Sequence, residues 1–412
     1  MTGADAGTAM ARTLVDEWAR AGVTDAVLAP GSRSTPLALA LAAEERMRLS
    51  VFLDERSASF FALGTAKASG LPVVLLCTSG TAAANFHPAV LEAWHARTPL
   101  IVCTADRPPE LRDTGAGQAI DQLKLYGDAV RWFVEVGVPE DVAGGQAGRY
   151  WRSVAVRAWA AAAGPPSGPV HLNLAFREPL VPTGAHLAEA PGRERGRPFV
   201  ESRPTPREPH PADVEAVAQA VDGAARGVLV AGWGAPVAPA VVNRFARAAG
   251  WPVLADAISG LRSGSHAVST YDPLLRGAPF AVRQRPDLVV HVGAPLTNRP
   301  ATAWLDESIP HVLVDPDGAW LDPHRVASRR IAADPEALLR AVTEHVCWRM
   351  TGGHWLEGWQ HAETAARRAV DDLLDSWDEP FEGRVARDVA AALPDGATLV
   401  VGSSMPVRDA ES

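Results

Sequence analysis

Short apolar runs alternate with helix-like segments along the first part of the 412-residue chain. Residues 72–77 and 100–104 are apolar runs that predict buried strands, and residues 56–68 and 81–96 predict helices. Strands that alternate with helices form a parallel sheet that is covered on both faces. The sequence therefore predicts an α/β fold, in which ligands bind at the loops that leave the carboxyl ends of the strands.

A second alternation of strands and helices follows a stretch with six prolines at residues 191–211. That composition cannot continue a helix or a strand and indicates a connection between domains. The strands expected beyond it lie at residues 227–232, 252–255, 287–292 and 311–314. The domains expected are a first domain at 1–185, a linker at 186–211, a middle domain at 212–346 and the start of a further domain at 347–412.

The last part of the chain has a pattern of its own. Trp348, Trp355 and Trp359 precede or begin a long helical pattern at 355–376, and we expect these rings to pack in a core. Residues 384–393 predict an amphipathic helix, and the sequence that follows, at 397–401, predicts a buried strand. One strand and one helix cannot bury their own faces, so we interpret this segment as the first step of a third, incomplete α/β domain.

Composition excludes several classes of protein. The chain has 39 basic and 48 acidic side chains, and no run of Lys or Arg creates the positive stripe of a nucleic-acid binder. Cys77 and Cys103 end apolar runs and are expected to be buried thiols, and with Cys347 they match no zinc-binding spacing. Neither a signal peptide nor an apolar stretch of about 20 residues is apparent, so we expect a cytoplasmic protein without a membrane span.

Two polar segments of the first domain follow apolar residues, namely Val51-Phe52-Leu53 and the run at 72–77. Asp54-Glu55-Arg56 places carboxylates at a strand end, where the alternative to a functional role is capping of the next helix by Asp54. The loop at residues 78–81 precedes a helix, and its amides and hydroxyls are suited to a polar ligand. It has no following Lys, so it is not a P-loop, and no GxGxxG segment supports nicotinamide binding.

Three arginines follow predicted strands, namely Arg33, Arg107 and Arg408. Each one alone is typical of a surface ion pair. At equivalent places in the topology, however, they indicate bidentate recognition of carboxylates on a small polyanionic substrate. The 12 histidines include no pair with metal-ligand spacing, so we expect no metal ligand among the side chains of this chain.

Five ordered segments together resemble one family, and a sixth follows near residue 405. They are residues 30–37 (PGSRSTPL), 54–58 (DERSA), 78–85 (TSGTAAAN), 104–108 (TADRP), 118–122 (QAIDQ) and 402–409 (GSSMPVRD). This combination resembles 2-succinyl-5-enolpyruvyl-6-hydroxy-3-cyclohexene-1-carboxylate synthase of menaquinone biosynthesis. The likeness is specific over residues 1–130 and weaker through the middle domain.

The resemblance implies a thiamine-diphosphate enzyme with a pyrimidine-binding domain, a Rossmann-like middle domain and a diphosphate-binding domain. It implies decarboxylation of 2-oxoglutarate, 1,4-addition of the resulting carbanion to isochorismate, and Mg²⁺ or Mn²⁺ at the diphosphate. It also implies a homodimer or a dimer of dimers, because the cofactor lies between two subunits. The segment that binds the metal has no counterpart in residues 1–412, so we expect it beyond them and expect this chain alone to be inactive.

The resemblance also implies residue roles. Glu55 matches the catalytic carboxylic acid that hydrogen-bonds the aminopyrimidine ring and so promotes deprotonation of the cofactor. The other cofactor-binding positions are Pro30, Ser79, Gly80, Thr81 and Asn85. The substrate-binding positions are Ser32, Arg33, Arg107, Gln118, Arg299, Ser404 and Arg408. The family often has Asn where this chain has Gly117, which affects one minor contact.

Two alternatives stay open at this point. The first alternative is another thiamine-dependent 2-oxoacid carboligase, although Arg33 and Arg107 favour dicarboxylates. The other alternative is a non-catalytic binding module, although such a module has no need of Glu55.

Overall fold

The computed structural model describes residues 3–140, 145–182, 190–347, 353–379 and 381–411. The chain divides into two compact units, Met1–Thr205 and Pro206–Ser412, and each is described by itself. The expected division at residues 185, 211 and 346 is finer than these two units and stays a prediction. None of the helices within the described ranges is long and apolar enough to cross a membrane.

The first unit contains a six-stranded parallel sheet in the order β2-β1-β3-β4-β6-β5. Its strands are β1 (Asp25–Leu28), β2 (Arg48–Val51), β3 (Val73–Cys77), β4 (Leu100–Asp106), β5 (Phe133–Glu135) and β6 (Pro169–Ala175). Its helices are α1 (Gly3–Arg20), α2 (Thr35–Ala42), α3 (Glu55–Ser69), α4 (Thr81–Asn85), α5 (His87–His95) and α6 (Gln146–Ala163), with short 3₁₀ turns at Ser32–Ser34, Pro109–Leu111 and Glu194–Gly196.

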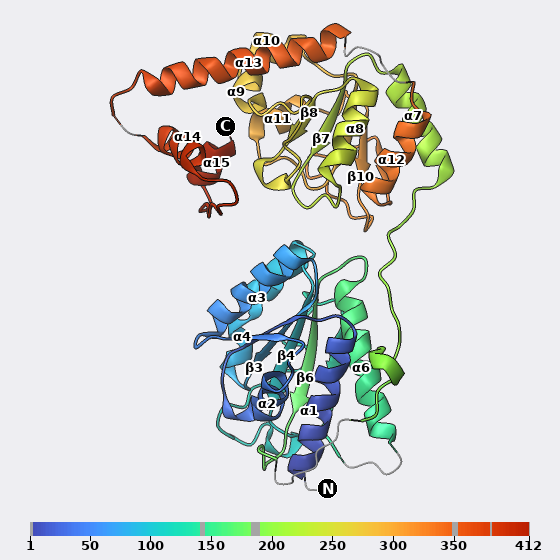
Figure 1. Cartoon of the computed structure of the whole chain (residues 1–412), viewed down its shortest axis with the longest axis vertical. Helices are drawn as coiled ribbons and strands as arrows, with labels where there is room; N and C mark the ends of the chain where they lie inside the picture. Colours follow the sequence, from blue (N-terminus) through green and yellow to red (C-terminus); the bar gives the residue numbers. More distant parts are fainter. Residues whose placement is uncertain (1–2, 141–144, 183–189, 348–352, 380, 412) are drawn as a thin grey trace. The chain divides into compact units, whose positions relative to one another are not determined.

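Helices cover both faces of this sheet because successive side chains of each buried strand point to opposite faces. Val74 and Leu76 of β3 pack in the core beneath α1, α2 and α6, whereas Leu75 and Cys77 pack in the core beneath α3 and α5. Figure 1 shows α1 and α6 side by side in this unit. The all-apolar run of β3 is therefore the signature of a strand buried on both faces.

The second unit contains a five-stranded parallel sheet in the order β11-β10-β9-β7-β8. Its strands are β7 (Gly227–Ala231), β8 (Val253–Ala255), β9 (Leu288–Val292), β10 (His311–Val314) and β11 (Arg329–Ile331). Its helices are α7 (Pro211–Gly223), α8 (Pro239–Ala249), α9 (Tyr271–Arg276), α10 (Ala278–Arg283), α11 (Arg299–Trp304), α12 (Pro335–His345), α13 (Gly353–Asp375), α14 (Glu382–Ala392) and α15 (Met405–Glu411), with a 3₁₀ turn at Ala257–Ser259.

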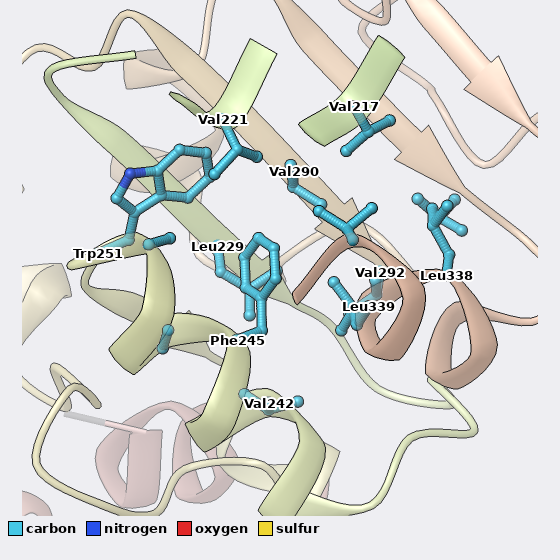
Figure 2. Packing of buried hydrophobic residues seen from close by; sticks show 14 of the residues in the cluster. Val217, Val221, Leu229, Val242, Phe245, Trp251, Val290, Val292, Leu338 and Leu339 are labelled. Atoms are coloured by element: carbon cyan, nitrogen blue, oxygen red, sulfur yellow. The ribbon is translucent and has the colours of Figure 1, made fainter. Parts of the chain in front are cut away.

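One core of this unit lies between the sheet and helices α7, α8 and α12 (Figure 2). Trp251 packs edge-on against Phe245 there, with ring centroids 5.8 Å apart. A Cβ atom on Gly227 would lie 1.8 Å from the Trp251 ring, so the first position of β7 accepts only glycine. The packing of one large ring thus selects the residue at the start of β7.

Most of the predicted elements are confirmed, including the α/β class and the strands predicted at 72–77, 100–104 and 311–314. The helix predicted at 81–96 is instead two helices, α4 and α5. Pro88 lies in the first turn of α5 and has no N–H to donate to a preceding turn, which explains the break.

The buried strand predicted at 397–401 is wrong. Those residues are exposed and have no strand conformation, and 88% of the Val400 side chain is accessible to solvent. A strand needs a neighbour for its peptide groups, and no neighbouring strand pairs with this segment among the described residues. The apolar run alone was therefore insufficient evidence for a strand.

The predicted core roles of the tryptophans and cysteines are confirmed in part. Trp359 is fully buried and contacts the rings of Trp304 and Trp355, with centroids 5.7 Å and 6.1 Å away. Trp348 lies outside the described residues. Cys77 and Cys103 are buried as predicted, while Cys347 is exposed.

Candidate active site

Three loops of the first unit meet at the carboxyl edge of its sheet, because β1, β3 and β4 are neighbours in the strand order. Gly31, after β1, lies against Thr78, after β3. A Cβ atom on Gly31 would lie 2.3 Å from the Thr78 Cβ atom, so glycine is required for this close approach. Of the predicted cofactor-binding residues on these loops, Ser79 and Gly80 are buried, and Pro30, Thr81 and Asn85 are exposed.

Arg107, which follows β4, contacts two other predicted site residues. Its guanidinium donates to the hydroxyl of Ser79 and approaches the Oε1 atom of Gln118 at 3.5 Å. Gln118 has a left-handed backbone, with a φ of 56°, and its backbone lies 3.1 Å from where a Cβ atom on Gly80 would stand. Gly80 therefore permits the Gln118 segment to close over the loop that follows β3.

Arg33 is almost fully buried beside this cluster. Its guanidinium donates to the carbonyl oxygen of Phe176 at 3.0 Å and to the carboxylate of Glu178 at 3.0 Å. Burial, and then the positive charge of Arg33, lowers the pKa of Arg107. Two guanidinium groups therefore lie near each other, and an anionic ligand would relieve their repulsion. Ser32 is exposed next to them.

Glu55 begins α3, just after the end of β2 and the loop that follows it. Asp54 caps this helix, because its carboxylate accepts a hydrogen bond of 2.7 Å from the Ser57 amide. The capping alternative therefore holds for Asp54. Burial, and then the negative charge of Glu55, raises the pKa of Cys77 at the end of β3, so the Glu55 carboxylate lies near the central strands. It is half-buried, and within the described residues it forms no hydrogen bond or ion pair.

A buried polar network supports the loop after β3 from below. The Gln122 Oε1 atom accepts a hydrogen bond of 2.8 Å from the Gly80 amide, and Gln122 Nε2 donates to Asn173 Oδ1 at 2.9 Å. Asn173 Nδ2 in turn donates to Asp106 at 2.8 Å and to Glu135 at 2.7 Å. The network thus links β3, β4, β5 and β6 behind the site.

Sequence reasoning missed Asn173, Glu135 and Arg112, which bridges the carboxylates of Asp106 and Glu135. One signal was present, since Asn173 interrupts an apolar strand and a buried amide requires partners. The identity of those partners depends on the order of the strands, which the sequence does not state.

We expect Gln122→Met to destabilise the first unit by about 1–3 kcal/mol, because it leaves the buried Gly80 amide without an acceptor. Urea denaturation of the purified variant measures this change. Gln118→Met is the matched control, because Gln118 is exposed, and we expect less than about 0.5 kcal/mol there. Equal stabilities of the two variants would contradict the supporting role of Gln122.

The remaining predicted substrate residues belong to the second unit. Arg299 is exposed at the start of α11, where Asn298 caps the helix by accepting a hydrogen bond of 2.9 Å from the Ala301 amide. Ser404 and Arg408 are exposed before and within α15. Among the residues that the structure describes, no group of three or more His, Cys, Asp or Glu side chains is arranged to hold a metal ion.

Two family models match the chain. Residues 5–125 match the thiamine pyrophosphate enzyme N-terminal TPP binding domain, and residues 196–401 match the middle domain of thiamine pyrophosphate enzymes. Among solved structures, benzoylformate decarboxylase from Polynucleobacter necessarius superposes with a TM-score of 0.63 over 82% of this chain, at 19% sequence identity. The chain covers 61% of that structure, and the likeness concerns the fold alone.

Curated relatives give a more specific match. The 2-succinyl-5-enolpyruvyl-6-hydroxy-3-cyclohexene-1-carboxylate synthases of Thermobifida fusca and Geobacillus kaustophilus are 49% and 45% identical to the chain. The alignments cover 98% and 99% of this chain and 70% and 71% of the respective relatives. At that identity and coverage, the chain belongs to the 2-succinyl-5-enolpyruvyl-6-hydroxy-3-cyclohexene-1-carboxylate synthase family of thiamine-pyrophosphate enzymes.

Proposed function

We propose that the protein decarboxylates 2-oxoglutarate and adds the remaining four-carbon unit to isochorismate, as a step of menaquinone biosynthesis. The observation that carries this proposal is the placement of the Arg33 and Arg107 pair at the same sheet edge as the unengaged Glu55 carboxylate. Both substrates carry two carboxylates, and guanidinium groups bind carboxylates in a bidentate manner. The names of the relatives support the same reaction.

The chemistry of the Glu55 region fits the aminopyrimidine end of thiamine diphosphate. A carboxyl group that no described residue engages is available to a ring nitrogen. When bound, thiamine diphosphate supplies the carbanion chemistry of the reaction. Glu55 holds a proton at the ring nitrogen, and we assign contacts with the cofactor to Pro30, Ser79, Gly80, Thr81 and Asn85.

The chain's remaining roles in this proposal concern binding. Ser32 and Gln118 flank the two arginines and orient a substrate carboxylate. We assign Arg299, Ser404 and Arg408 to substrate contacts as well. We further propose Mg²⁺ or Mn²⁺ at the diphosphate, assembly as a homodimer or a dimer of dimers, and a cytoplasmic location. The structure has no disulfide among Cys77, Cys103 and Cys347, which fits a reducing compartment.

A direct assay tests the proposed reaction. The protein, purified together with the metal-binding segment expected beyond residue 412, is supplied with thiamine diphosphate and Mg²⁺, and product is measured with 2-oxoglutarate plus isochorismate or with pyruvate plus isochorismate. We expect product only with 2-oxoglutarate. Turnover of pyruvate at a comparable rate would favour another thiamine-dependent carboligase. Tight binding of thiamine diphosphate without turnover of either 2-oxoacid would favour a binding module.

Arg107→Gln tests the carboxylate contact. Loss of one charged hydrogen-bond donor costs about 1.5–3 kcal/mol, so we expect the KM of one dicarboxylate substrate to rise roughly 10-fold to 100-fold. Steady-state kinetics with each substrate varied in turn measure the change. Arg177→Gln is the control, because Arg177 forms a surface ion pair with Glu110 in which both side chains are about half exposed. An equal rise in KM for both variants would contradict the assignment.

A further inference from the structure

The side chain of Glu411, at the end of α15, is held by three donors of the second unit. Its carboxylate accepts hydrogen bonds from the Ala257 amide at 2.7 Å, from Arg262 Nη2 at 2.5 Å and from the Tyr271 hydroxyl at 2.5 Å. Arg262 Nη1 also donates to the main-chain carbonyl oxygen of Glu411 at 2.8 Å. Arg262 therefore binds both the side chain and the backbone of this residue.

The three donors are positioned by the sheet and not by α15. Ala257 follows β8 by two residues, and Arg262 Nε donates to the carbonyl oxygen of Ala255 in β8 at 3.1 Å. Tyr271 begins α9 and is fully buried, so its hydroxyl has little freedom to move. An amide, a guanidinium and a hydroxyl that converge in this way make a site for one carboxylate at the carboxyl end of a parallel strand.

Asp256 lies beside this site and adds a second carboxyl group near Glu411. Asp256 is fully buried, and its Oδ2 atom has no hydrogen-bond partner among the described residues. Burial, and then the negative charge of Glu411, raises the pKa of Asp256 to about 6. The charged and titratable groups that face Glu411 here are Asp256, Arg262 and Tyr271. The Arg262 guanidinium therefore faces two carboxyl groups, those of Asp256 and Glu411. The three hydrogen-bond donors bind the Glu411 carboxylate.

Glu411 differs from the rest of its segment. Within the described residues 395–411 it is the one buried residue, while Ser404, Met405 and Arg408 are exposed. Apolar burial therefore contributes little to the attachment of α15, although α15 also contacts α14. Charged hydrogen bonds to a buried carboxylate contribute roughly 1.5–3 kcal/mol each. The Glu411 contacts therefore supply most of the free energy that attaches the end of α15.

We propose that Glu411 is a positioning residue, whose carboxylate docks α15 on the Ala257, Arg262 and Tyr271 donors and thereby fixes Ser404 and Arg408. Arg408 lies three residues before Glu411 in the same helix, so a fixed Glu411 fixes the turn that carries Arg408. The part of this inference that concerns substrate rests on the proposed function. The docking of α15 does not depend on the proposed function.

Hydrogen exchange of the 405–411 amides in the whole protein tests the docking. We expect Glu411→Gln to increase their exchange at least 10-fold, because the neutral amide loses charge-assisted bonds worth more than about 1.4 kcal/mol. Asp409→Asn is the matched control on the same helix, and we expect it to leave exchange unchanged. Wild-type exchange as fast as that of Glu411→Gln would overturn the docking.

A double-substitution cycle identifies the partner. If Arg262 acts through the Glu411 carboxylate, the effects of Arg262→Gln and Glu411→Gln on exchange will be less than multiplicative in the double variant, because both substitutions remove the same side-chain contact. The bond from Arg262 to the Glu411 carbonyl oxygen remains in Glu411→Gln and accounts for a further increase in the double variant. Independent, multiplying effects would overturn the direct contact.

Kinetics then test the positioning. In the active protein we expect Glu411→Gln to raise the KM of the same substrate as Arg408→Gln, with a smaller change in kcat. An unchanged KM together with faster exchange would overturn the positioning role and leave the docking intact. If the wild type turns over neither 2-oxoglutarate nor isochorismate, the proposed function fails, and the exchange experiment still decides the docking.

Discussion

Glu55→Gln is expected to lower turnover roughly 10²-fold to 10⁴-fold, the range typical of a lost proton-transfer group. The amide of glutamine cannot supply the acidic proton that a carboxylic acid gives to a ring nitrogen. Folding should change little, because the Glu55 carboxylate has no partner within the described residues and Asp54 caps α3. Turnover is measured with 2-oxoglutarate and isochorismate at saturating thiamine diphosphate.

Two controls accompany this variant. Glu92→Gln removes an exposed carboxylate from α5 and should leave both turnover and stability unchanged. Glu55→Asp retains the acid on a shorter side chain, and we expect intermediate activity. Near-wild-type turnover of Glu55→Gln would eliminate the proton-relay role, and the Arg33 and Arg107 proposal would then need a different chemistry.

Arg152→Met is expected to destabilise the first unit by about 3–5 kcal/mol, because it leaves buried acids without their counter-charge. Arg152 is fully buried in α6 and pairs with Asp16 and Glu17 of α1, the latter at 2.8 Å. Glu17 is also fully buried and accepts a hydrogen bond from the Phe199 amide. Asp16 retains Arg20 and Arg46, so the uncompensated charge falls on Glu17.

Urea denaturation measures this loss, and Arg157→Met is the matched control on the same helix. Arg157 is exposed and lies 4.6 Å above the ring of Trp132, an interaction worth about 0.5–1 kcal/mol. The double variant Arg152→Met with Glu17→Gln should recover part of the stability by removing the stranded charge. Equal stabilities of Arg152→Met and Arg157→Met would show that the buried cluster contributes no more than a surface contact.

The strongly apolar strands were predictable, because β3 and β4 are buried on both faces and leave uninterrupted apolar runs. Among the short edge strands, β8 was predicted and β11 was not. β11 has three residues, two of them exposed arginines, so its strand conformation depends on pairing with β10. Residues 397–401 show the converse, since an apolar run without a neighbouring strand does not form one.

The position of the candidate site was predictable for a similar reason. Strand order brings the carboxyl ends of parallel strands to one edge, so Ser79 and Arg107 come together, as the topology requires. The support beneath them was not predictable, because the contacts of Asn173 join β6 to residues more than 30 positions away. The docking of Glu411 on Arg262 likewise spans 149 positions, and no local pattern encodes such a pairing.

The contrast among the three cysteines makes the protein convenient to label. Burial raises the pKa of Cys77 and Cys103 well above that of a free thiol, and neither reaches solvent, so maleimide dyes will not react with them. Cys347 is exposed just after α12, and the chain contains no fourth cysteine. Within these 412 residues, a fluorophore can therefore be attached at one position without any substitution, and its emission will report on events beside the end of α12.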